Sequence, residues 1–178
     1  TVDRIDYTND TATTVAKGPL SVARTNAGAT GNATFGYWGG GSPGEKTTMD
    51  RLDYSSDTTA CAPKGPLSAG RNQITATGNI HYGYFAGGVI APGPIVTTID
   101  RLDYSSDTTT CSPRGSLTAG RKYLGATSSR ENNLPRIENG GVYQTSERGF
   151  KRTQGTPYGY FIGGNGGSSI VDRVDYGN

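Results

Sequence analysis

The residues best suited to chemistry in this chain are the acidic and hydroxyl side chains of a repeated Asp-Tyr-Ser-Ser-Asp stretch, at residues 53–57 and 103–107. Oxygen ligands at alternate positions are typical of calcium loops, although the following glycine and the distal bidentate glutamate of such loops are missing here. Asp and Ser side chains also cap turns by bonding to nearby backbone groups. Calcium binding and turn capping are both open on these residues, and turn capping is the simpler prediction.

Other candidates for catalysis are few. The single histidine, His81, has no Ser or Cys motif beside it, and we expect an exposed turn residue. In the motif Asp-Arg-x-Asp-Tyr, Arg51 and Asp53 share one strand face, and an ion-pair ladder across strands or between repeats accounts for them. An active site needs its groups once, whereas this motif recurs along the chain. The sequence therefore predicts no enzyme activity, no cofactor and no metal site.

The two cysteines, Cys61 and Cys111, occupy the same place in successive repeats. Neither belongs to a paired-cysteine motif, so no zinc site is expected. Equivalent positions in neighbouring repeats usually lie too far apart for a disulfide, whose Cα atoms must be within about 7 Å. We predict two small buried side chains in the place of Thr14 of the first copy.

One irregular insertion, residues 128–157, is the best candidate for a binding surface. It stands where the other copies have a tight Gly-Asn turn, and loops longer than about 15 residues are usually functional or disordered. Its cations and rings suit a polyanion or a partner chain, but its glutamates argue against a pure phosphate-binding patch. Structural cover for a blade edge is the open alternative. The candidate residues are Arg130, Arg136, Tyr143, Arg148, Phe150, Lys151 and Arg152.

Two further kinds of surface site depend on single residues. An exposed Trp38, with the loops around Pro43 and Pro92, would suit sugar stacking. Trp38 occupies the slot of a phenylalanine in other copies, however, and this favours core packing. Asn9 and Asn32 lie in Asn-x-Thr sequons within predicted turns, and are candidate N-glycosylation sites if the protein is secreted.

A repeat with a period near fifty residues must position all of these side chains. Copies of the motif Asp-Arg-x-Asp-Tyr begin at Asp3, Asp50, Asp100 and Asp172. The alternation in the first copy predicts a half-buried strand, with Ile5 and Tyr7 on one face. One full period predicts four short strands, near residues 23–30, 35–40, 50–54 and 58–62.

Glycines mark the connections between these strands. The pairs Gly31-Asn32 and Gly78-Asn79 are expected to form hairpin turns with left-handed backbone conformers. The double glycines that end each aromatic strand are expected where φ becomes positive or where two backbones approach closely.

The composition fits short strands joined by tight turns. Among 178 residues there are 28 Gly and 11 Tyr, and the net charge is only +2. Many Gly and Thr with few Lys or Glu favour strands over helices. The near-neutral balance gives no field to attract nucleic acid or anionic membranes, and no apolar run is long enough to span a bilayer. We therefore predict neither nucleic acid binding nor membrane insertion.

The ordered series of motifs resembles the kelch type of β-propeller repeat. The residues that carry the resemblance are the double glycines Gly40-Gly41, Gly87-Gly88 and Gly163-Gly164, the aromatic residues Tyr7, Tyr54, Tyr104 and Tyr176, the turns Pro19-Leu20, Pro66-Leu67 and Ser116-Leu117, and the arginines Arg24, Arg71 and Arg121. The tryptophan that usually follows the turn in that family is absent, with Ala12, Thr59 and Thr109 in its place. The resemblance covers all but the insertion. It implies an all-β protein of about three four-stranded antiparallel blades with incomplete ends.

The blade boundaries follow from the copies of the motif. Residues 1–20 hold the last two strands of a partial blade, 21–67 and 68–117 are complete blades, and 118–178 is a partial blade with the insertion. Three blades cannot close a ring, because propellers have about 4–8 blades. Open edge strands invite pairing. Flanking sequence would cover the ends, or copies of the chain would associate head-to-tail by sharing edge strands or blades.

These features predict a non-enzymatic structural or adhesion module of an extracellular fibre or a virion appendage, because tandem repeats with such close internal identity resemble sequences of those proteins. The alternative is a lectin-like propeller that binds surface glycans. The expected location is extracellular or in a virion. The chain lacks an initiator Met and begins inside a repeat motif, so we expect a processed product or an excerpt of a longer polypeptide.

Overall fold

The protein is all-β, as the sequence predicts. A computed structural model describes residues 2–9, 11–128, 158–165 and 167–176. The strands in these residues are β1 (Asp3–Arg4), β2 (Val15–Ala16), β3 (Gly28–Gly31), β4 (Phe35–Gly39), β5 (Met49–Asp53), β6 (Ala62–Lys64), β7 (Thr75–Gly78), β8 (Tyr82–Ala86), β9 (Thr98–Asp103), β10 (Ser112–Ser116), β11 (Gly125–Ser128), β12 (Tyr158–Ile162) and β13 (Val171–Asp175). Two 3-10 turns, Tyr54–Ser56 and Tyr104–Ser106, follow β5 and β9.

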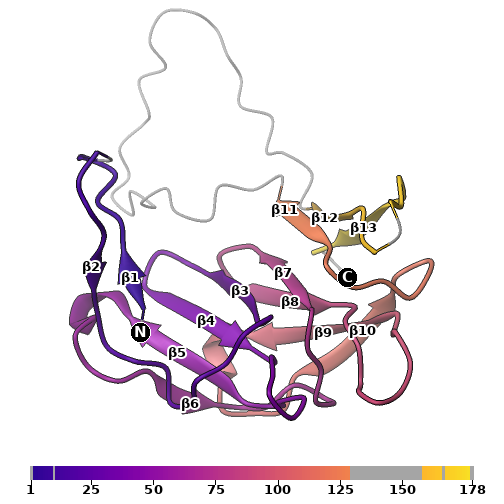
Figure 1. Cartoon of the computed structure of the whole chain (residues 1–178), viewed down its shortest axis with the longest axis horizontal. Helices are drawn as coiled ribbons and strands as arrows, with labels where there is room; N and C mark the ends of the chain where they lie inside the picture. The colour runs from indigo at the N-terminus through magenta and orange to yellow at the C-terminus, as the bar shows by residue number, and fades with distance from the viewer. Residues whose placement is uncertain (1, 10, 129–157, 166, 177–178) are drawn as a thin grey trace, which may run out of the picture.

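Each repeat builds one antiparallel sheet from strands that are consecutive in the chain. The sheets are the hairpin β1–β2, the four-stranded sheets β3–β6 and β7–β10, and the three-stranded sheet β11–β13. Figure 1 shows the hairpin at one side and β11–β13 at the other, with the two larger sheets between them. The first strands of successive sheets touch, β3 against β7 and β7 against β11. None of these sheets closes on itself within the described residues.

The hydrophobic core lies between neighbouring sheets. One cluster joins β3–β6 to β7–β10 and contains Tyr37, Met49, Leu67, Ile74, Phe85, Leu102, Tyr104 and Cys111. A second joins β7–β10 to β11–β13 and contains Tyr84, Ala86, Ile99, Leu117, Leu124, Phe161 and Tyr176. Each sheet therefore depends on the next one to cover its apolar face.

The first repeat departs from the predicted pattern because its hairpin has no equivalents of β3 and β4 beside it. Ile5 is 41% exposed and Tyr7 is 89% exposed, so the prediction of a half-buried strand over these residues is wrong. The equivalent Tyr104 and Tyr176 are buried between sheets.

The cysteine prediction is confirmed. Cys61 and Cys111 are both buried and both free. Burial raises the pKa of Cys111 to about 12, so its thiol is protonated at neutral pH. Cys111 belongs to the first core cluster, where it serves as a small apolar side chain.

The glycine predictions divide into two outcomes. Gly40 and Gly41 have φ of +71° and +106°, as expected of the double glycines, and the Gly41 N–H donates to the carbonyl of Arg71 in the next sheet at 2.8 Å. The residues Gly31 and Asn32 do not adopt the expected left-handed conformers. The Asn32 side chain caps this turn instead, because its Oδ1 accepts the N–H groups of Thr34, just before β4, and of Phe35, its first residue.

Two strands of the period start later than the sequence predicts. The first strand starts at Gly28, because Asn26 has φ +56° and interrupts the extended backbone before it. The fourth strand starts at Ala62, because the segment before it is used by a 3-10 turn and by a further turn in which the Thr59 N–H donates to Ser56.

Candidate functional site: an aspartate latch between neighbouring sheets

Each sheet with more than two strands holds a buried pair that we call the arginine clasp: Arg24–Asp50, Arg71–Asp100 and Arg121–Asp172. In the second of these, Nη2 lies 2.7 Å from Asp100 Oδ2 and Nη1 donates to the carbonyls of Gly87 and Thr98. The clasp ties the segment before the first strand to the third strand of the same sheet. The arginine and the first aspartate of the repeat are therefore structural.

A second acidic group, the aspartate latch, joins one sheet to the next. Asp107 follows β9, but its partners Tyr37, Arg51 and Lys64 lie on β4, β5 and β6. Its Oδ2 accepts from Tyr37 Oη at 3.0 Å and from Arg51 Nη1 at 2.7 Å, and its Oδ1 lies 3.4 Å from Lys64 Nζ. Asp107 is 7% exposed, so this is a built carboxylate site with three donors. Arg51 therefore forms an ion pair between two sheets, but with Asp107, whereas Asp53 of the predicted ladder caps a turn.

The phenol of Tyr37 is held in its donor form. Burial, followed by the hydrogen bond to Asp107, raises the pKa of Tyr37. Its ring also stacks on Tyr104 of the next sheet, with centroids 5.0 Å apart and planes at 12°. Tyr104 Oη lies 3.1 Å from Thr30 Oγ1 on β3. One tyrosine pair therefore supports both the apolar and the polar part of the junction.

Backbone hydrogen bonds complete the latch. The Gly65 N–H donates to the carbonyl of Asp107 at 2.8 Å, and the Cys111 N–H donates to the carbonyl of Pro66 at 2.8 Å. A Cβ on Gly65 would lie 1.8 Å from the carbonyl oxygen of Thr109, so only glycine permits this approach. The turn at 104–111 thus docks on residues 64–66 of the preceding sheet.

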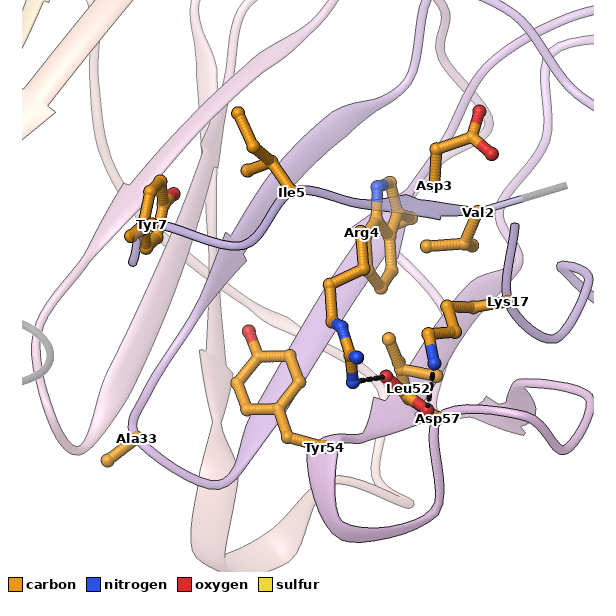
Figure 2. Close-up of a pocket in the computed structure, with 11 residues that line it drawn as sticks. Val2, Asp3, Arg4, Ile5, Tyr7, Lys17, Ala33, Leu52, Tyr54 and Asp57 are labelled. Carbon is orange, nitrogen blue, oxygen red and sulfur yellow. Dashed lines mark hydrogen bonds and ion pairs between the residues drawn. The ribbon is translucent and has the colours of Figure 1, made fainter. Parts of the chain in front are cut away.

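The latch at the hairpin is incomplete. Asp57 Oδ2 accepts from Arg4 Nη1 at 2.7 Å, and Lys17 Nζ lies 3.2 Å from Oδ1, as Figure 2 shows. Burial opposes ionisation of Asp57, but the hydrogen bond from Lys17 and the charge of Arg4 lower its pKa overall. The hairpin supplies no counterpart of Tyr37.

A pocket of about 660 Å³ lies where that counterpart would stand, between the hairpin and β3–β6. Trp38 and Tyr54 line it together with Ile5 and Tyr7. Figure 2 shows Tyr54 beside the Arg4–Asp57 pair, and Ile5 and Tyr7 farther along the hairpin. The prediction that Trp38 packs in the core is wrong. Trp38 has the repeat position of a buried phenylalanine, but among the described residues only the two-stranded hairpin faces it across the pocket, so it is half-buried.

The other predicted site residues fall outside this pocket. Pro43 and Pro92, which the sugar-stacking hypothesis joined to Trp38, are exposed and do not line it. His81 is an exposed turn residue, as predicted. Asn9 and Asn32 lie in turns, as predicted. The cationic and aromatic candidates of the insertion, from Arg130 to Arg152, lie outside the described residues.

Turn capping accounts for the residues of the calcium hypothesis. Asp53 Oδ1 accepts from the N–H and from Oγ of Ser55, at 2.9 and 2.6 Å, and these bonds lower the pKa of Asp53. Asp57, the third member of the pattern, is directed to Arg4 and Lys17 instead. Among the described residues there is no group of three acidic, His or Cys side chains that could hold a metal ion.

The sequence interpretation missed the latch. The sequence gives no role to Tyr37 or Lys64, and it suggests Asp107 only as a calcium ligand or a turn cap, whereas the structure brings all three together. One feature of the sequence could have indicated the latch. A cation precedes a glycine at the same position of each repeat, in Lys17, Lys64 and Arg114.

Comparison of the chain with protein-family models and with curated proteins gives no match. In the part of the chain that the structure describes, no helix has the length and apolar character needed to cross a membrane.

Proposed function

We propose that this chain is a non-enzymatic structural and adhesion module, built from kelch-like propeller blades, that assembles head-to-tail with further copies of itself. The observation that carries the proposal is the pocket beside Trp38 and Tyr54, where the hairpin β1–β2 has no first and second strands. The close identity of the tandem repeats, which resembles that of virion appendages and secreted fibres, supports a place in such a structure.

Strands β11 and β12 of a second copy fit this pocket because they correspond in the repeat to β3 and β4. Tyr160 on β12 has the repeat position of Tyr37, which stacks on Tyr104 and donates to the latch aspartate. Tyr54 and Asp57 have the positions of that stacked tyrosine and that aspartate. Tyr160 of a second copy would therefore cover Tyr54 and complete the latch at Asp57.

Strand exchange gives each junction a complete sheet. β13 pairs with β12 through the pattern Val-Asp-Arg-Val-Asp-Tyr, and residues 2–7 repeat it as Val-Asp-Arg-Ile-Asp-Tyr. A second copy's β1 would take the place of β13, and its β2 would form the fourth strand. A closed pair would then hold two complete sheets from each copy and one shared sheet at each of two junctions. The resulting six sheets lie within the range of about 4–8 blades typical of propellers, and a junction that does not close gives a filament.

Self-association of the chain tests the proposal. Sedimentation velocity, native mass spectrometry and negative-stain imaging are expected to show closed pairs or filaments that form in a concentration-dependent way. Tyr160→Phe removes one hydroxyl and is expected to weaken the assembly about 10- to 100-fold, since the hydrogen bond to an ionised partner contributes about 1.5–3 kcal/mol.

The exposed Tyr123, changed to Phe, is the matched control and is expected to leave the assembly unchanged. A chain that stays monomeric across the accessible concentration range would sink the proposal.

The same pocket supports a second candidate function, carbohydrate binding. The half-buried Trp38 and the exposed Tyr54 offer rings for stacking, and the Arg4–Asp57 pair offers polar contacts. A monomeric chain that binds immobilised glycans, with binding lost in Trp38→Ala, would favour the lectin. Polymers together with silence on a glycan array would favour the structural module.

A further inference from the structure

Three residues with a left-handed backbone lie at one position of the repeat. Asn26, Gln73 and Tyr123 have φ of +56°, +56° and +57°, and each stands two residues before the first strand of its sheet. The Gln73 N–H donates to the carbonyl of Asn26 at 2.9 Å, and the Tyr123 N–H donates to the carbonyl of Gln73 at 3.1 Å. The three residues therefore follow one another across the junctions between sheets, and their side chains leave adjacent points of the backbone.

The backbone at this position is strained because the residues are not glycine. Glycine adopts a positive φ without strain, and the other nine positions with a positive φ among the described residues are all glycine. A Cβ makes this conformation costly, least in Asn and more in Gln and Tyr. The hydrogen bonds between the repeats use backbone groups only, so glycine would form them equally well. The chain therefore carries side chains here that its backbone bonds do not require.

These side chains lie at or near the surface. Asn26 is exposed although the sheet that begins with β7 packs beside its own, and Tyr123 is 58% exposed. Gln73 is half-buried, and its Oε1 has no hydrogen-bond partner among the described residues. No bond of this oxygen within the described residues offsets the strain at Gln73. Backbone strain that the fold does not require is a feature of residues that serve binding.

A positive charge stands beside the exposed tyrosine ring. Lys122 Nζ lies 5.5 Å from the centroid of the Tyr123 ring. The carbonyl of Lys122 accepts from the Asn165 N–H at 2.9 Å, which holds the backbone of this residue in place. The surface therefore combines one aromatic ring, two side-chain amides and one cation.

We infer that Asn26, Gln73 and Tyr123 form a saccharide-binding surface, with Lys122 selecting sugars that carry a carboxylate. A tyrosine offers an apolar ring to the C–H face of a pyranose and a hydroxyl to its polar edge. Each amide has two N–H donors and a carbonyl acceptor, which suit the neighbouring hydroxyls of a sugar. The ammonium of Lys122 pairs with the carboxylate of a uronic or sialic acid residue.

This surface is distinct from the pocket beside Trp38. None of its four residues lines that pocket. All four belong to one chain, so the surface does not depend on the proposed self-assembly. Only its use in adhesion rests on the proposed function, to which it adds a class of ligand.

A glycan array that carries sialylated, uronic acid and neutral oligosaccharides tests the surface on the full chain. Binding is expected on the acidic sugars, and calorimetric titration with the best of them gives the affinity. Lys122→Gln is expected to reduce the affinity for the acidic sugar about 10-fold, because a charge-assisted bond is lost. Lys122→Arg is the matched control and is expected to keep the preference, because the charge remains.

Glycine variants separate binding from folding. Tyr123→Gly and Gln73→Gly are each expected to weaken sugar binding about 10-fold or more, because a stacking ring or an amide is removed. The thermal midpoint is expected to stay unchanged or to rise, because glycine relieves the strain. A side chain that served only the fold would show the opposite result, with a lower midpoint and the same affinity.

The outcomes distinguish this surface from the other proposals. Silence of the whole array overturns it, as does a lower midpoint with unchanged affinity in both glycine variants. Binding that is lost in Trp38→Ala but kept in Tyr123→Gly also overturns it and places the sugar in the pocket. Binding that needs Tyr123 and Gln73 in a chain that stays monomeric supports the surface and removes the proposed assembly.

Discussion

Arg71 is the largest side chain that the fold buries completely. Its guanidinium is neutralised by Asp100, but Arg71 Nε and Asp100 Oδ1 have no hydrogen-bond partner among the described residues. A buried ion pair adds little net stability over an apolar pair, whereas loss of one member leaves an uncompensated charge. The clasp therefore determines which segments of the chain come together, and it adds little to the net free energy of unfolding.

Arg71→Met is expected to lower the free energy of unfolding by about 3–5 kcal/mol, because Asp100 then remains charged in an apolar site. Urea unfolding followed by circular dichroism measures the loss. The matched control is Arg4→Ala, which breaks an ion pair whose arginine is 58% exposed and is expected to cost below about 1 kcal/mol. Equal losses in the two variants would contradict this account of the clasp.

At the scale of residues, the sequence predicted ion pairing but not its partners. The sequence predicts that Arg51 and Asp53 belong to one ladder of ion pairs, because they share a strand face. In the structure Arg51 binds Asp107 of the next sheet and Asp53 caps a turn. Strand alternation says which side chains share a face, but the docking of a second sheet decides what that face meets. This information is not local in the sequence.

Gly65 shows how an element, the turn after each third strand, docks on the sheet before it. Gly65→Ala places a methyl group 1.8 Å from the Thr109 carbonyl oxygen, and backbone cannot move aside as a flexible side chain can. We expect a loss of about 3 kcal/mol in the free energy of unfolding, at the upper end of overpacking costs. Thermal or urea unfolding gives the value.

Gly125→Ala is the matched control, since the nearest atom to a new Cβ there would be 4.0 Å away. Alanine inside a strand is expected to leave stability unchanged or raise it by about 0.5–1 kcal/mol. A Gly65→Ala protein as stable as Gly125→Ala would show that the turn does not dock as closely as described.

At the scale of elements, periodicity predicted one four-stranded unit per repeat and the conformers of the double glycines. The strand limits and the hairpin turns were less accurate. The side chains of Asn32 and Asn79 each accept two backbone N–H groups, and this capping replaces the left-handed turn that Gly-Asn suggests. Two local turn chemistries compete for the same dipeptide, and the register of the flanking strands selects between them.

For the whole molecule, every core cluster and every complete latch among the described residues joins neighbours in the repeat order. Stability in such arrays is close to a sum over units and their interfaces. The sequence predicted the order of the units, whereas the incomplete latch at Asp57 is evident only when its contacts are compared with those of Asp107.

A chain that lacks residues 60–109 is therefore expected to fold. The deletion joins β5 to β10, and Tyr176 then has Tyr37 in place of Tyr84 as its stacking partner. We expect a β-type circular dichroism spectrum and a cooperative transition at lower stability, because one core cluster is lost. Removal of residues 70–109 is the control, because it breaks the period and the sheet order. If the chain without residues 60–109 aggregated or unfolded gradually, this would contradict the view that each sheet packs only on its neighbours.

The latch turn also has a consequence for inheritance. Residues 50–59 and 100–109 are identical, and each run encodes the turn that docks one sheet on its predecessor. Unequal recombination between the two coding stretches removes or duplicates one whole period and recreates the same junction at the crossover. Such an exchange keeps the order of strands within the period, whereas a crossover between positions that are not equivalent in the repeat breaks that order.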